Sequence, residues 1–139
     1  MRLSGSVSSV IRTFTVTMCV AGLSVGTAHA QAEGNIALKS GESAVVQTLW
    51  YVSQCRSIMI GMPEVEILEG PPELTLSVAP DKVLPRRLNC PNKVEGGTLT
   101  ATAKDVKEPI HSQVTYRVKY KTKDGDRQVS HVYKVELFP

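Results

Sequence analysis

Alternating apolar and polar positions mark the C-terminal third of the chain. Residues 114–120 and 129–137 place apolar or aromatic side chains, together with His131, at every second position. This period of two predicts two half-buried strands. Asp124-Gly125 lies between them and favours a two-residue type I′ turn. We therefore predict a hairpin in which residues whose numbers sum to 249 face each other, so that Tyr116 lies opposite Tyr133.

Shorter stretches upstream carry the same signature. Residues 64–67, 73–78 and 98–103 alternate between apolar and polar side chains, and residues 36–39 suggest a short edge strand. Residues 44–52 are apolar, with β-branched and aromatic members, which predicts a strand buried on much of both faces. About six or seven short strands separated by Gly, Pro and Asp predict an all-β, antiparallel β-sandwich of immunoglobulin (Ig-like) type.

Residues 79–93 interrupt this pattern. Prolines at positions 80, 85 and 91 cannot donate a hydrogen bond to a sheet, and two arginines add charge. We predict a long loop here, tied down by Cys90. Loops held on rigid scaffolds often carry binding function, so the candidate binding residues are Arg86, Arg87 and Lys93.

The first 30 residues have the composition of a cleavable signal peptide. Residues 1–30 hold Arg2 and Arg12, an apolar stretch, and the small-residue motif Ala28-His29-Ala30. The apolar stretch has about a dozen residues, whereas a helix spans a bilayer with roughly 20, so we expect removal and no stable membrane insertion. Residues 31–139 then form the mature domain, in the periplasm or secreted. Cys19 offers lipidation as an alternative, although the residues before it depart from that motif.

Two cysteines remain after cleavage, Cys55 and Cys90. An exported chain reaches a compartment that sustains disulfides, so we expect these two to pair. Closing a loop of this length stabilises a fold by about 4 kcal/mol in the chain-entropy model. A reactive thiol and a pair of thiolate ligands are the alternatives.

Cleavage also changes the charge balance. Residues 31–139 hold 14 Lys and Arg against 13 Asp and Glu, a net charge of +1, which gives no reason to expect nucleic acid as a partner. The distribution is uneven, because residues 31–81 hold two basic and seven acidic residues and residues 82–139 hold twelve and six. Either oppositely charged strands lie side by side, or the surface is bipolar and suits a charged partner.

In several of these features, the chain resembles small exported proteins of proteobacteria that have one Ig-like domain and one disulfide. The resemblance covers nearly all of residues 31–139 and implies an exported β-sandwich, but no activity. The chain lacks the acidic calcium-binding clusters of the cadherin-like modules found in larger proteins of this type. The residues that carry the resemblance are Gly41-Glu42, Cys55, Pro63, Val65, Gly70-Pro71-Pro72, Cys90 and Tyr116-Arg117-Val118-Lys119-Tyr120 before Asp124-Gly125.

Catalytic chemistry has little support in the sequence. It contains no nucleophile elbow, zinc-binding helix motif or phosphate-binding glycine loop, so we expect no enzyme and no cofactor. Glu64 and Glu66 share one strand face and should point to water rather than form a catalytic pair. His131 is expected at the edge of the core, and His111 should lie exposed and far from it. Trp50-Tyr51 could stack on a sugar, but core packing is favoured.

These observations favour a non-catalytic interaction module of the cell envelope or the medium, with a protein or an envelope polymer as partner. One alternative is a periplasmic copper-binding protein, in which Met59 and Met62 would supply soft ligands and a histidine would join them. Packing explains the two methionines equally well, and no metal site is assigned. A second alternative is a secreted enzyme inhibitor that presents residues 79–93 as a stiff loop.

Overall fold

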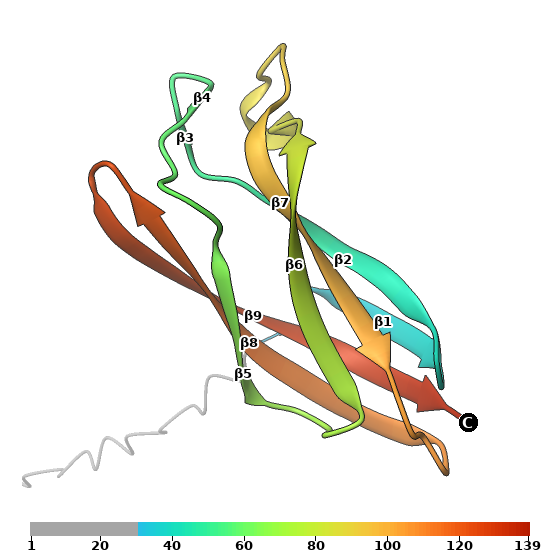
Figure 1. Cartoon of the computed structure of the whole chain (residues 1–139). Coiled ribbons are helices and arrows are strands. Elements are labelled where there is room, and N and C mark those ends of the chain that lie inside the picture. The colour runs from blue at the N-terminus through green and yellow to red at the C-terminus, as the bar shows by residue number, and fades with distance from the viewer. Residues whose placement is uncertain (1–30) are drawn as a thin grey trace, which may run out of the picture.

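A computed structural model of the chain describes residues 31–139. The predicted signal peptide, with Ala28-His29-Ala30 and Cys19, lies outside the described residues. Strands dominate the described part, and one short 3-10 turn, η1, spans Arg86–Leu88. Figure 1 shows the strands stacked in two layers. The strands are β1 Gly34–Lys39, β2 Ser43–Leu49, β3 Val52–Ser53, β4 Arg56–Ser57, β5 Glu64–Glu69, β6 Leu74–Val83, β7 Val94–Ala103, β8 Ile110–Thr122 and β9 Gly125–Phe138.

The two main sheets have the strand orders β1-β9-β8-β5 and β2-β7-β6, and β3 pairs only with β4. In an immunoglobulin-type sandwich, strands B, E and D lie in one sheet and strands C, F and G in the other. Strands β2, β7 and β6 occupy the first set of places, and β5, β8 and β9 occupy the second. The first strand, β1, runs parallel to β9, and the other pairs are antiparallel. The predicted Ig-like β-sandwich is confirmed.

The core lies between the two sheets, where the period-two pattern places it. Alternate residues of β8 are fully buried, as are the C-terminal residues of β9 that face the same way. The opposite sheet contributes small and branched side chains from β7, which let the layers approach closely. The largest fully buried side chains are Tyr116, Leu49, Leu99, Leu137, Val114, Val118 and Val135.

The β8–β9 hairpin forms as predicted, but its register differs by two residues. Tyr116 faces His131 rather than Tyr133, and the closing pair is Thr122 with Gly125. Gly125 has a φ of +107°, whereas Asp124 is not among the residues with positive φ, so the type I′ turn is wrong. The two-residue turn is instead Lys123-Asp124, and Gly125 follows it as the first residue of β9 with a positive φ. The inward faces still meet, because a shift of two residues keeps every side chain on its side of the sheet.

The hydroxyl of Thr122 explains this choice of turn. Its Oγ1 donates a hydrogen bond to the Gly125 carbonyl at 2.6 Å and accepts one from the Asp124 amide at 3.2 Å. Apart from the tyrosines, Thr122 is the one buried polar side chain found in residues 31–139. Its local hydrogen bonds satisfy the hydroxyl and hold the backbone of the turn, as short polar side chains often do.

Two predicted segments need correction. Residues 44–52 are not buried on both faces: β2 ends at Leu49, lies at a sheet edge, and leaves Val45 63% exposed. The predicted loop of residues 79–93 begins later, because β6 continues through Pro80 to Val83. Strand β6 is also an edge strand, where a proline without an N–H group removes no hydrogen bond from the sheet. The loop proper is residues 84–93.

Candidate interaction surface

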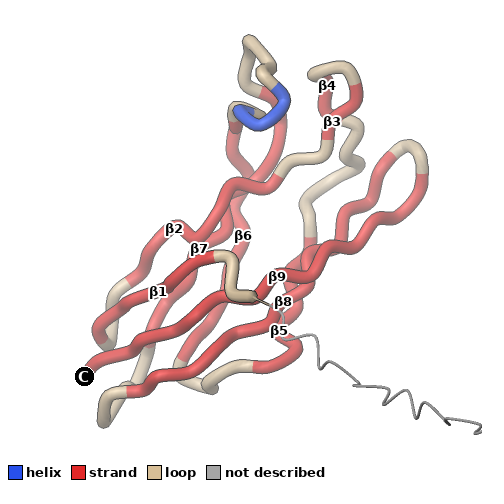
Figure 2. The backbone as a smooth tube through the Cα atoms, turned by 180° about the vertical axis from the view of Figure 1, so that it is seen from behind, coloured by secondary structure: helices blue, strands red, loops and turns tan. Residues whose placement is uncertain are grey.

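Three connections gather at one end of the sandwich. They are the chain between β2 and β5, the loop between β6 and β7, and the tip of the β8–β9 hairpin, and both views of the fold show them on the same side (Figures 1 and 2). In Figure 1 the β3–β4 hairpin lies between the other two. We call this surface the loop end and define it as residues 50–62, 84–93 and 121–127.

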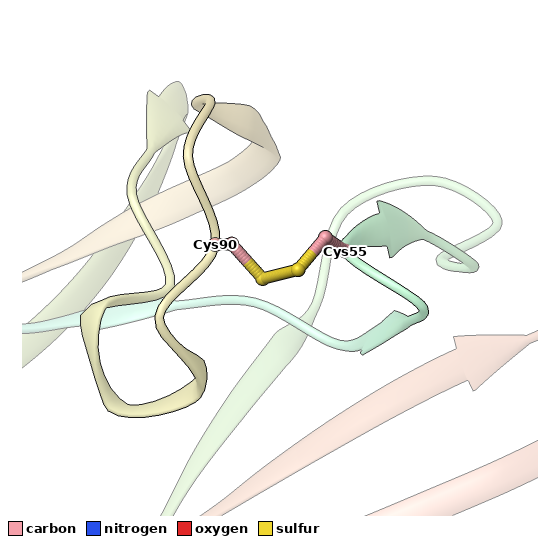
Figure 3. The surroundings of a disulfide bond; sticks show 2 residues. All are labelled: Cys55 and Cys90. Atoms are coloured by element: carbon pink, nitrogen blue, oxygen red, sulfur yellow. A yellow bond between two sulfur atoms is a disulfide. The ribbon is translucent and has the colours of Figure 1, made fainter.

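A disulfide joins the first two connections of the loop end. Cys55, at the tip of the β3–β4 hairpin, bonds to Cys90 in the loop after η1, with the two Cα atoms 5.4 Å apart (Figure 3). The predicted pairing is confirmed. Its position is unusual for the fold, since the immunoglobulin disulfide bridges two core strands and this one bridges two loops. The bond therefore restricts the loop end directly.

The tip of the β3–β4 hairpin adopts a demanding backbone conformation. Gln54 and Cys55 have φ values of 51° and 59°, and neither is a glycine. Two consecutive residues with positive φ match a type I′ turn, the turn that the sequence suggested for another hairpin. Such conformations cost of order 1 kcal/mol or more per residue and persist where the surroundings determine them. The disulfide at Cys55 is one such determinant.

Backbone hydrogen bonds join the first connection to the third. The Ile60 amide donates to the Lys121 carbonyl at 2.7 Å, and the Lys123 amide donates to the Ile58 carbonyl at 3.0 Å. Met59 forms an isolated antiparallel bridge with Thr122 between these bonds. Residues 58–60 thus lie alongside the end of β8 and fix the hairpin tip relative to the disulfide.

An aromatic pair lies beneath this junction. The rings of Tyr51 and Tyr120 lie 5.4 Å apart between centroids. Burial, and secondarily the neighbouring Tyr51, raises the pKa of Tyr120 to about 12. Tyr120 is therefore neutral at physiological pH and acts as an apolar wall for the loop end.

The predicted binding residues Arg86, Arg87 and Lys93 are all exposed on the loop between β6 and β7. The two arginines lie in η1, and Asn89 ends this turn in the left-handed conformation. A side chain at the tip of a covalently anchored loop is accessible and loses little backbone entropy on binding.

The structure adds cations from the other two connections, which the sequence analysis did not single out. Arg56 follows Cys55, and Lys121, Lys123 and Arg127 surround the hairpin tip. The loop end then holds seven Lys and Arg against Asp124 and Asp126, a balance of +5. Within residues 31–139 none of the seven forms an ion pair. The excess of basic residues after position 82 was the available signal, but only the fold brings these positions together.

Apolar side chains are exposed among these cations. Ile60 and Leu88 are 57% and 53% exposed, and Met62 is 40% exposed. Next to Met62 lies a pocket of about 80 Å³, whose walls include Tyr120 and Arg127. The loop end thus combines arginine, methionine and aromatic side chains, which are the types enriched at protein interfaces.

The other residues that the sequence singled out lie elsewhere or have ordinary roles. His131 Nδ1 lies 2.7 Å from Glu33 Oε2, and its ring packs against Tyr116. Glu64 and Glu66 are exposed on β5, and Glu66 pairs with Lys119 Nζ at 3.1 Å. This pair shows oppositely charged strands compensating one another, as one interpretation of the charge pattern predicts. Trp50 is half-buried.

The methionines do not meet a histidine. Met59 packs against the core and bridges Thr122, whereas His131 faces Tyr116, six positions along β8, or about 20 Å at 3.3 Å per residue. His111 is exposed near the opposite end of β8. In the described part of the chain, no group of three or more His, Cys, Asp or Glu side chains could hold a metal ion. The structure therefore supplies no histidine for the copper hypothesis.

Within residues 31–139, no helix has the length and apolar character needed to cross a membrane. No protein-family model matches the chain, and no curated protein matches it either.

Proposed function

We propose that the protein is an exported, non-catalytic interaction module, and that it binds its partner through the loop end. The observation that carries the proposal is the covalent anchoring of a basic, exposed loop to a neighbouring hairpin. Arg86, Arg87 and Lys93 form no ion pair within residues 31–139, so their charges are available to a partner. A disulfide-anchored loop loses less conformational entropy on binding than a free one, which favours affinity.

The cellular location is part of the same proposal. Residues 1–30 would direct export and be removed, which places the protein in the periplasm or outside the cell. The Cys55–Cys90 disulfide is compatible with such an oxidising compartment. Sequencing the N-terminus of the protein after export tests this directly: a start at Gln31 supports removal, and a start at Met1 contradicts it.

A matched set of charge-reversed variants tests the binding surface. The loop variant carries Arg86→Glu, Arg87→Glu and Lys93→Glu. The far-end variant carries Lys39→Glu, Lys104→Glu and Lys107→Glu, three exposed cations at the opposite end of the sandwich. Both variants have the same net charge, so they differ only in where the charge is reversed.

The two variants and the wild type are purified after export, immobilised, and exposed to cell-envelope extract. A partner retained by the wild type and the far-end variant, but lost by the loop variant, supports the proposal. A partner retained equally by all three places binding elsewhere and overturns it. If the partner is an enzyme whose activity falls on binding, the module acts as an inhibitor.

A further inference from the structure

We infer that the loop end recognises an acidic polypeptide segment that places one apolar side chain in the pocket between Met62, Tyr120 and Arg127. The inference rests on the proposed function and specifies the chemical class of the partner. It also enlarges the surface, because the tip of the β8–β9 hairpin would contribute as much as the loop that carries Arg86.

Charge distinguishes the two ends of the sandwich. The loop end has seven basic and two acidic side chains, whereas residues 39–43, 69–73 and 104–109 at the far end have three and five. The balances are +5 and −2, in a chain of residues 31–139 with a net charge of only +1. The basic loop end would attract an acidic partner, and the acidic far end would repel it. The summed charges would therefore steer the partner toward the loop end as the two molecules associate.

The exposed apolar side chains indicate what else the partner carries. Four of the seven large hydrophobic side chains that residues 31–139 expose belong to the loop end or adjoin it: Ile60, Met62, Leu88 and Val129. A partner that offered only negative charge would leave them in water. A partner with apolar side chains next to its carboxylates would cover them, and their burial would add to the affinity.

The pocket limits the size of the anchor. Its volume of about 80 Å³ lies between the roughly 30 Å³ of liquid that one water molecule occupies and the roughly 150 Å³ of a cavity that holds benzene. One aliphatic side chain suits this space. Met62 and Tyr120 provide apolar surface, and Lys121 and Arg127 also line the pocket, where they can meet carboxylates next to the anchor. Glu64 and Asp126 also line it and would disfavour acids inside.

A polypeptide fits these features better than a bilayer or a charged polysaccharide. The outermost residues of the hairpin tip are polar, so this part of the loop end offers no apolar side chain for insertion into a bilayer. A polysaccharide rich in acidic groups satisfies the cations but has no aliphatic side chain for the pocket. An acidic peptide segment supplies carboxylates for the cations and an aliphatic side chain for the pocket.

Two synthetic peptides of equal charge serve as probes, each capped at both ends and labelled for fluorescence anisotropy. Both consist of a central residue between two runs of four glutamates; the central residue is leucine in the leucine peptide and serine in the serine peptide. We expect the wild type to bind the leucine peptide about tenfold more tightly, because only leucine fills the pocket. Dextran sulfate and vesicles of anionic phospholipid are the competing ligands. Equal binding of the two peptides, or no binding of either, overturns the inference.

Variants at the hairpin separate this inference from the proposed function. The hairpin variant carries Lys121→Glu, Lys123→Glu and Arg127→Glu, and has the same net charge as the loop and far-end variants. We expect the affinity for the leucine peptide to fall at least tenfold in the hairpin and loop variants. In the far-end variant this affinity should change less than twofold. Met62→Gln should abolish the preference for leucine and leave binding of the serine peptide unchanged. Circular dichroism confirms that each variant is folded.

The pattern of losses decides between the two proposals. If the loop variant loses binding and the hairpin variant does not, the inference is wrong and the proposed function stands. If the loop, hairpin and far-end variants all bind the leucine peptide as the wild type does, the inference is wrong, and retention of the envelope partner by the loop and far-end variants decides the proposed function. Displacement of the leucine peptide by dextran sulfate or vesicles, with no preference for leucine over serine, would identify a general polyanion surface and also overturn the inference.

Discussion

The two ends of the sandwich are closed by different means. At the far end, the connections bind one another through the backbone: the Gly41 amide donates to the Ala103 carbonyl, the Ala103 amide to Glu42, and the Lys104 amide to Glu73. At the loop end, a disulfide and a short backbone ladder join three longer connections. The far end also balances its charges more closely than the loop end does.

The difference shows that a connection between strands can either stabilise the fold or present side chains to a partner. Short turns that satisfy their own backbone groups contribute to the fold and leave little surface for a partner. Longer connections need another constraint, and a covalent bond supplies it while the side chains around it stay free. Anchoring by a disulfide therefore allows the loop end to carry exposed cations and apolar groups on an ordered backbone.

Removing the disulfide should change the stability of the loop end relative to the far end more than any other substitution. The double variant Cys55→Ser/Cys90→Ser loses the constraint on a 35-residue separation, and we expect unfolding to become easier by about 4 kcal/mol. Denaturant unfolding measures this change, and the reduced wild type is the control. Hydrogen exchange should accelerate first in residues 50–62 and 84–93, while β2, β7 and the far-end turns keep their protection. Uniform acceleration at both ends would contradict the distinction drawn between them.

Alkaline pH should also destabilise the fold through Tyr120, which lies beside the loop end. The pKa of Tyr120 is raised to about 12 by burial and by Tyr51, whereas tyrosine in the unfolded chain titrates near 10. The unfolded state therefore releases this proton first, and the stability that the group contributes is complete below pH 10 and lost as pH rises to 12. We expect a loss of about 2 kcal/mol over this interval. Tyr120→Phe should flatten the decline; an unchanged slope would show that Tyr120 is not its source.

Tyr116, near the middle of the sandwich, should also lower the stability of the fold at alkaline pH. Burial raises its pKa, and the neighbouring Tyr133 and Glu33 raise it further. Its hydroxyl is buried next to Tyr133. Tyr116→Phe should therefore also flatten the alkaline decline, and comparing it with Tyr120→Phe separates the contribution of the middle of the sandwich from that of the residue beside the loop end.

At the hairpin tip, Thr122→Val should lower stability by about 1 to 2 kcal/mol. The substitution keeps the shape of the side chain but removes the hydroxyl that bonds to the Gly125 carbonyl and the Asp124 amide, so the turn loses both of these hydrogen bonds. Thermal unfolding measures the loss, and Thr122→Ser, which keeps the hydroxyl, should recover most of it. Equal losses for valine and serine would mean that the methyl group, rather than the hydroxyl, matters.

The corresponding test at the far end should have the smallest effect. Ser40 Oγ accepts a hydrogen bond from the Val106 amide at 3.2 Å, and Val106 is buried. Ser40→Ala should destabilise the fold by about 1 kcal/mol and leave peptide binding at the loop end unchanged. A change in binding would show that the two ends are coupled through the sandwich.

The strands and the cysteine pair were predictable from the sequence because their signals are local or nearly so. Alternation from Val114 to Tyr120 identified the buried face of β8, and two cysteines leave one possible bridge. The hairpin register was not predictable, because the local sequence allows the two-residue turn at Asp124-Gly125 or at Lys123-Asp124, and the hydroxyl of Thr122 favours the second. Pro80 was misleading because its effect depends on whether its strand lies at an edge.

The candidate site was only partly predictable. Arg86, Arg87 and Lys93 are neighbours in sequence and share a proline-rich segment, so they could be proposed together. Arg56, Lys121 and Arg127 come from two other connections, and no local pattern links them. Their association follows from the order of strands in the two sheets, which places these three connections at one end.

The most direct test of the central claim compares the loop variant with the far-end variant in their affinity for the leucine peptide at physiological ionic strength, where salt screens charges beyond roughly 8 Å. Both variants carry the same net charge, so nonspecific attraction to the whole molecule is matched. We expect the far-end variant to bind as the wild type does and the loop variant to bind at least tenfold more weakly. Equal affinities for the two variants would contradict the claim that the loop end is the binding surface.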